Sequence, residues 1–177
     1  MDIQKLKKRI KVWLLIFIAG LLLSGLTAFP LAWELSLLHR LLTNAASPVP
    51  TLWPELAAWI TLVNEGLQDT YRHYPFVAYG TDWLAFAHIV IAIAFWGPLK
   101  DPVRNIWVVE FGMIACILVV PLALIFGPIR GIPLFWRLID CSFGVLGIIP
   151  LWICRRQIIR LEALERESAK PMLPAFP

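Results

Sequence analysis

Four long apolar stretches, separated by shorter polar segments, dominate the pattern of residues along this chain. They cover about residues 12–33, 81–99, 102–126 and 134–154. Because a helix rises about 1.5 Å per residue, each stretch is about long enough to cross a hydrocarbon layer of roughly 30 Å. The pattern therefore predicts an all-α fold: a polytopic integral membrane bundle of four transmembrane helices, forming a single domain over residues 1–177.

The long segment 41–79, between the first two stretches, predicts an additional helix outside the membrane. A run rich in Pro and Ser at 46–50 is typical of a loop, and Pro54 followed by Glu55 favours a helix start. Apolar residues then recur every three or four positions, at Leu56, Ile60, Val63 and Leu67. We expect an amphipathic helix at about 54–74, lying at the outer membrane interface.

Basic residues are concentrated on one side of the predicted membrane. The chain has 16 Lys and Arg against 12 Asp and Glu, a formal net charge of +4, and 59% hydrophobic residues. Twelve basic residues would lie on one side: Lys5, Lys7, Lys8, Arg9, Lys11, Lys100, Arg104, Arg155, Arg156, Arg160, Arg166 and Lys170. Four would lie on the other side: Arg40, Arg72, Arg130 and Arg137.

This charge asymmetry predicts the orientation of the chain. By the positive-inside rule, both termini are cytoplasmic, and we expect a bacterial inner (plasma) membrane. The mixed Glu and Arg residues after the fourth stretch predict a cytoplasmic C-terminal helix at about 155–169. Since the positive charge is explained by orientation, we expect membrane lipid and other membrane subunits as partners, and no nucleic acid.

The first stretch carries two small residues, Gly20 and Ser24, four positions apart on one helical face. Small residues at this spacing allow the backbone of a second helix to approach closely within a membrane. They indicate a helix–helix contact surface.

Ionisable residues inside the apolar stretches are the strongest candidates for chemistry. A charge near the centre of a span costs at least ~2.5–3.5 kcal/mol, so each needs a partner or a function. Helical periodicity places His88 on a face with Ala85 and Ala92. It places Arg137, Asp140, Gly144 and Gly147 on one stripe of the fourth helix. If both faces point inward, Asp82, His88, Arg137 and Asp140 converge in the outer half of the bundle.

Specific roles follow from the chemistry of these side chains. As catalytic candidates, Asp140 would be a base or ligand, Asp82 its carboxylate partner and His88 a proton carrier. The substrate-binding candidates are Arg137, as an anion anchor, with His73, Tyr74 and Tyr79 of the outer segment. Glu110 lies in the opposite half of the membrane, where we expect it to pair with Arg104 or with the N-terminal segment.

The same residues allow other interpretations. In a purely structural network, Arg137 pairs with Asp140 and with Asp82, while His88 bonds a backbone carbonyl or Asp140. We predict no cofactor, and a haem or metal ion at His88 stays open as an alternative. A proton path from Asp82 and Asp140 through His88 to Glu110 is a third alternative.

The size, the four spans and the sequence Trp136–Asp140 are loosely similar to lipoprotein signal peptidases, whose last helix begins F-N-x-A-D. In this chain Arg137 stands at the position of the Asn, and 122–130 lacks the second aspartate that the family carries there. The resemblance covers five residues, and we assign no family from it.

For function, the sequence favours a small polytopic membrane protein acting as a non-catalytic subunit or assembly partner of a membrane complex. The alternative is a membrane-embedded enzyme or binder with an outward-facing Asp/His/Arg pocket for an amphiphilic lipid or lipopeptide substrate.

Overall fold

The computed structural model describes residues 3–169, and every regular element in that range is a helix. The elements are α1 (Ile3–Ala28), α2 (Leu31–Thr43), α3 (Val49–Leu52), α4 (Pro54–His73), the 3-10 helix η1 (Pro75–Ala78), α5 (Tyr79–Ala94), α6 (Trp96–Lys100), α7 (Ile106–Ile129) and α8 (Leu134–Ser168). Within residues 3–169, four helical segments are long and apolar enough to cross a membrane: α1, Pro75–Lys100, α7 and α8. The all-helical prediction is confirmed, as is the number of segments of spanning length.

The described residues group into two compact units, one built from residues 3–20 and 92–169 and the other from 21–91. The prediction of a single transmembrane domain is not tested by this division. Each unit has its own packing.

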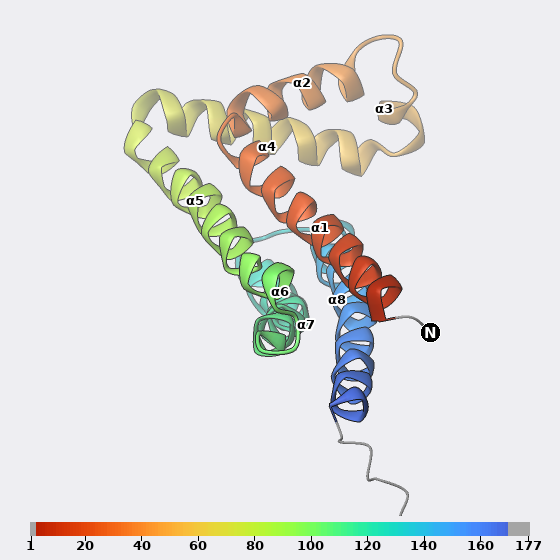
Figure 1. The fold of residues 1–177 in the computed structure, drawn as a ribbon. Helices are drawn as coiled ribbons and strands as arrows, with labels where there is room; N and C mark the ends of the chain where they lie inside the picture. The colour runs from red at the N-terminus through yellow and green to blue at the C-terminus, as the bar shows by residue number, and fades with distance from the viewer. Residues whose placement is uncertain (1–2, 170–177) are drawn as a thin grey trace, which may run out of the picture. The chain divides into compact units, whose positions relative to one another are not determined.

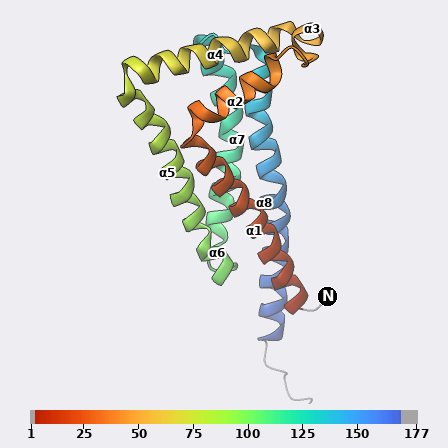
Figure 2. The ribbon, with the colours of Figure 1, turned by 90° about the horizontal axis from the view of Figure 1, so that it is seen from above.

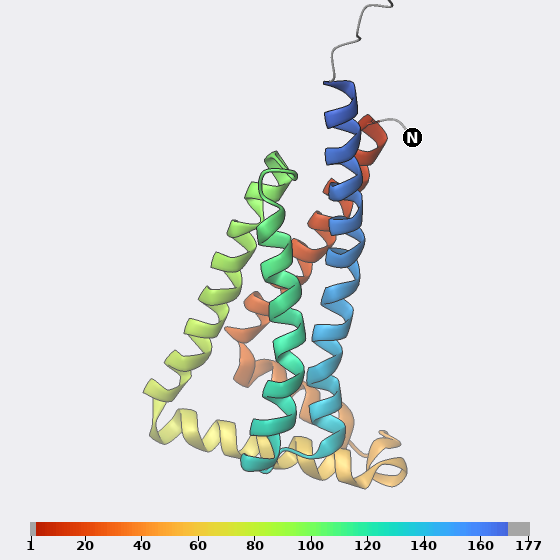
Figure 3. The same cartoon turned by 90° about the horizontal axis from the view of Figure 1, so that it is seen from below.

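The first unit is built around the antiparallel pair of α7 and α8, which run side by side in Figure 3. Glycines allow this close approach. A Cβ on Gly144 would collide with the backbone carbonyl of Cys116, and one on Gly112 would lie 2.9 Å from Leu151 Cδ1. The ring of Phe95 packs 4.8 Å from that of Phe17, and Phe95 is fully buried.

The second unit is built around a hairpin of α2 and α4, with the short α3 in the connection between them (Figures 1 and 2). The buried residues of this hairpin are Leu35, Ala57 and Ile60. A polar seam also joins the two helices. Ser36 Oγ donates to Asn64 Oδ1 at 3.1 Å, and Gln68 Nε2 donates to Ser36 Oγ at 2.8 Å and to the Ala32 carbonyl at 3.1 Å.

The amphipathic helix predicted at 54–74 is observed as α4, whereas the helix α2 was not predicted. The sequence suggested one span over 12–33, but α1 ends at Ala28 and a new helix begins after Pro30. Proline lacks a backbone N–H and its ring clashes with the preceding turn, so a helix cannot continue through it undisturbed. The apolar run extends beyond this break, which explains why a single span was expected.

The other helix bounds also differ from the predicted stretches. The predicted stretch 81–99 is divided between α5 and α6, and the predicted span 102–126 begins later, at Ile106. Residues 102–105 form a turn in which Asp101 Oδ1 accepts the backbone N–H of Arg104 at 3.0 Å. Asp101 therefore caps this turn rather than the long helix. The fourth stretch and the charged helix predicted at 155–169 are one continuous helix, α8.

Candidate functional site

His88 lies in the middle of α5, on the face predicted to point inward. Ala85 is fully buried and His88 is half-buried. A Cβ on Gly25 of α1 would lie 2.8 Å from His88 Cβ, so this glycine allows α1 and α5 to meet at His88. The ring Nδ1 is 2.8 Å from the Leu84 carbonyl oxygen. Since a carbonyl can only accept, Nδ1 carries a proton, and in the neutral ring Nε2 is left as the acceptor.

This hydrogen bond within α5 agrees with the structural interpretation of His88, in which the ring bonds a backbone carbonyl. Asp82 lies in the first turn of the same helix and is half-buried. An acidic residue in a first turn also interacts favourably with the helix dipole. Both residues therefore have structural roles that need no ligand.

Arg137 and Asp140 lie on α8. The aliphatic part of Arg137 packs on the buried Gly127 of α7. Its Nε atom is buried and has no hydrogen-bond partner within residues 3–169. No ion pair joins Arg137 to Asp140 in the described chain, so the i,i+3 pair of the purely structural interpretation is not formed. Gly144 and Gly147 of the same stripe pack against Cys116 of α7, as their spacing predicted.

Asp82 and His88 belong to the unit of residues 21–91, whereas Arg137 and Asp140 belong to the other unit. The pocket formed by all four residues therefore stays a prediction. Within residues 3–169, no group of three or more His, Cys, Asp or Glu side chains is arranged to hold a metal ion.

His73, Tyr74 and Tyr79 lie at the corner between α4 and α5 and are exposed. The His73 ring Nδ1 is 3.0 Å from Asp69 Oδ1, one helical turn earlier. The aromatic rings around the corner contact one another edge to face: Tyr74 with Phe76, Tyr79 with Trp83, and Trp83 with Phe86. An exposed cluster of aromatic rings is typical of residues at a membrane–water interface.

Glu110 has a partner that the sequence analysis missed. Arg155 Nε of α8 donates to Glu110 Oε1 at 2.8 Å, so the expected pairing with Arg104 or the N-terminal segment was wrong. The signal was present in the short connection at 130–133. Gly127 with Arg137, Gly112 with Leu151 and Glu110 with Arg155 lie at nearly equal distances from that connection. In an antiparallel helix pair, residues equally far from the connection lie opposite one another, and Arg155 is the basic residue at that position opposite Glu110.

Two hollows are found beside the first turns of α1, both lined by residues of the first unit. One, of about 390 Å³, contains Lys7, Lys11 and Lys100 together with Asp101 and Glu165. Lys7 Nζ is 2.8 Å from Glu165 Oε1 of α8. The other, of about 340 Å³, is lined by Lys5, Lys8, Arg9, Val12 and Trp13.

The sequence matches no protein-family model, and neither a curated protein nor a solved structure is similar to it at a significant level.

Proposed function

We propose that this chain is an integral membrane protein that acts as a non-catalytic subunit, docking on another membrane protein through the face of α1 around Gly20. Large apolar side chains on the four spanning segments are widely exposed, among them Leu23, Phe86, Leu118 and Leu146 at 53–66%. Apolar surface of this extent is rare on soluble monomers. In a membrane it is stable, because lipid tails and neighbouring helices cover it.

The observation that carries the proposal is the surroundings of Gly20. Gly25, Gly112, Gly144 and Gly147 are all used for close contacts within the chain. At Gly20, by contrast, an added Cβ would meet no described atom within 4 Å. A helical glycine costs roughly 0.5–1 kcal/mol relative to alanine, which a close helix contact can offset. Gly20 makes no such contact within the described chain, so we propose that it contacts a helix of a partner protein.

The residues next to Gly20 on α1 fit a docking surface. Ile16, Leu23 and Ser24 lie three or four positions from Gly20 and are all exposed. A small residue at every fourth position, flanked by branched apolar side chains, is the pattern by which membrane helices pack closely. The partner is therefore expected to be a transmembrane helix.

The orientation follows from the basic residues: both termini are cytoplasmic and the α2–α4 hairpin lies on the outer surface. Twelve of the 16 basic residues are then on the inner side: the five in the first three turns of α1, Lys100 and Arg104 near the turn before α7, and the five after Cys154. The exposed aromatic cluster around Tyr79 and Trp83 would occupy the outer interface. A bacterial inner membrane suits this arrangement.

The test is purification in mild detergent from native membranes, comparing the chain with Gly20→Leu. We expect the chain to co-elute with a stable membrane partner and the Gly20→Leu chain to lose that partner, because the added side chain separates the two backbones. Gly66→Leu on α4 is the matched control, since an added Cβ there also meets no described atom within 4 Å. Retention of the partner by Gly20→Leu would contradict the docking surface.

A monomer in the same experiment would favour the second candidate, a membrane-embedded enzyme or binder for an amphiphilic substrate. The observation in its favour is the buried Nε of Arg137, which has no hydrogen-bond partner in residues 3–169. A guanidinium in this position could hold the anionic group of a lipid or lipopeptide.

A further inference from the structure

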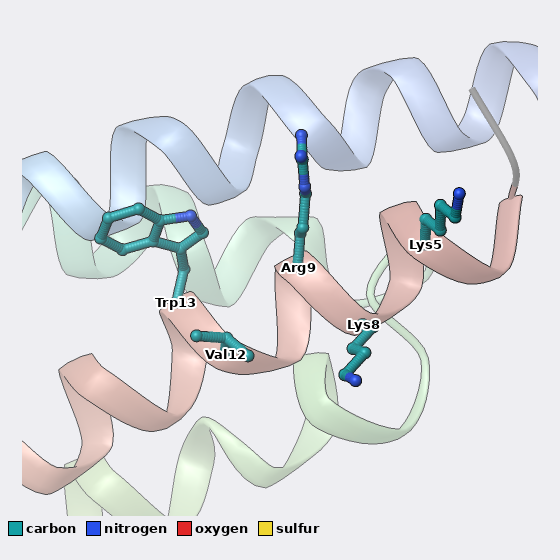
Figure 4. A pocket seen from close by; sticks show the side chains of 5 residues that line it. All are labelled: Lys5, Lys8, Arg9, Val12 and Trp13. Carbon is teal, nitrogen blue, oxygen red and sulfur yellow. The ribbon is translucent and has the colours of Figure 1, made fainter.

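The hollow lined by Lys5, Lys8, Arg9, Val12 and Trp13 is cationic on one end and apolar on the other. The five residues occupy two rows on the exposed surface of α1. Figure 4 shows Lys5, Arg9 and Trp13 extending to one side of the helix and Lys8 and Val12 to the other. The hollow that these five residues line has a volume of about 340 Å³.

We propose that this hollow binds the headgroup of an anionic phospholipid, with the phosphate among Lys5, Lys8 and Arg9 and an acyl chain along Val12 and Trp13. The proposal rests on the membrane location proposed above. Its occupant is identified by the order of the lining residues, which change from charged to apolar over about two turns of α1. A phospholipid has the same order of polarity from headgroup to chain.

The charges around α1 support an anionic ligand. On the other side of the helix, Lys7 is paired with Glu165, and the second hollow also contains Asp101. The hollow of Lys5, Lys8 and Arg9 has no acidic residue in its lining, and no ion pair involves Lys5 or Lys8 within residues 3–169. Three positive charges within five residues, close to the positive end of the α1 dipole, favour an anion there.

The packing of α1 keeps this surface in place. Leu6, Ile10 and Leu14 form a stripe that is fully buried, while Lys5, Lys8, Arg9 and Val12 are exposed. Because the buried stripe fixes the rotation of α1 about its axis, the hollow faces away from the core of the first unit. Trp13 is half-buried, as expected for a ring that borders both packed protein and lipid.

The test uses the full chain in neutral detergent, with native mass spectrometry to count retained dioleoyl phosphatidylglycerol or dioleoyl phosphatidylcholine. We expect selective retention of the anionic lipid, and a loss of about fivefold for each basic side chain removed in the series to Lys5→Gln/Lys8→Gln/Arg9→Gln. The matched control is Arg40→Gln/Arg72→Gln/Arg130→Gln, which removes the same charge from exposed positions outside the hollow. Equal loss in both triple variants, or equal retention of the two lipids, would overturn the proposal.

The apolar end of the hollow distinguishes a lipid from a free phosphate. Trp13→Ala should lower retention of phosphatidylglycerol, and inorganic phosphate at millimolar concentration should not displace the lipid. Displacement by phosphate with no effect of Trp13→Ala would mean that the site recognises a soluble anion, which overturns the lipid assignment. None of these results depends on Gly20, and alkaline carbonate extraction of the membranes tests the membrane location separately.

Discussion

At the scale of single residues, the glycines divide into those that pack and those that do not. Gly144 lies directly against the backbone carbonyl of Cys116, which cannot move without displacing α7. Gly66 on α4 has open space where its Cβ would be. The sequence predicted that the glycine stripe of the fourth span would face inward, but spacing alone could not show which glycines elsewhere were in contact.

This difference predicts opposite effects of the same substitution. Gly144→Ala should lower the free energy of unfolding by about 1–3 kcal/mol, because an added methyl group overpacks the α7–α8 contact. Gly66→Ala should raise it by roughly 0.5–1 kcal/mol, because alanine loses less backbone entropy in a helix. The apparent unfolding midpoint in neutral detergent measures both changes. A Gly144→Ala protein as stable as the parent chain would contradict the close contact.

At the scale of helices, the α2–α4 hairpin depends on a polar seam as well as on buried apolar residues. Ser36 is its central residue, donating to Asn64 Oδ1 and accepting from Gln68 Nε2. The sequence pattern predicted α4 from its apolar spacing but not its partner α2. Ser, Asn and Gln at positions 36, 64 and 68 carry no pairing signal until both helices are placed.

Ser36→Ala should loosen the hairpin, because Asn64 and Gln68 each lose a hydrogen bond worth about 0.5–1.5 kcal/mol. We expect faster hydrogen–deuterium exchange of backbone amides in α2 and α4, with little change in α7 and α8. Thr70→Ala is the control, since the Thr70 hydroxyl bonds the Gly66 carbonyl within its own helix. Exchange that is unchanged in Ser36→Ala, or equally fast in both variants, would show that the seam does not stabilise the hairpin.

At the scale of the whole molecule, the length of the apolar stretches was the property of the sequence that predicted the spanning helices. Four apolar stretches predicted four helical segments of spanning length, and the described part of the chain contains four. The ends of the helices were less predictable, because Pro30 divides an apolar run and residues 102–105 form a capped turn. The proposed convergence of Asp82, His88, Arg137 and Asp140 depends on tertiary placement that residue spacing cannot supply.

The proposed orientation also belongs to this scale. In intact bacterial cells, a membrane-impermeant maleimide should label Ser47→Cys, between α2 and α3, and should not label Ser168→Cys at the end of α8 before lysis. The parent chain provides the background from the free Cys116, Cys141 and Cys154. Labelling of both positions from outside, or of Ser168→Cys alone, would reverse or reject the orientation inferred from the basic residues.

The four-residue connection between α7 and α8 has a consequence for how this chain could vary over evolution. Gly131 adopts a φ of 68° there, and the helices on either side pair in antiparallel register. One residue inserted at the start of α8 would rotate the rest of that helix by about 100°. Gly144 and Gly147 would then point away from Cys116. Surface loops usually tolerate changes in length. In this protein, the connection at 130–133 should permit little variation in length, because the contacts between α7 and α8 depend on it.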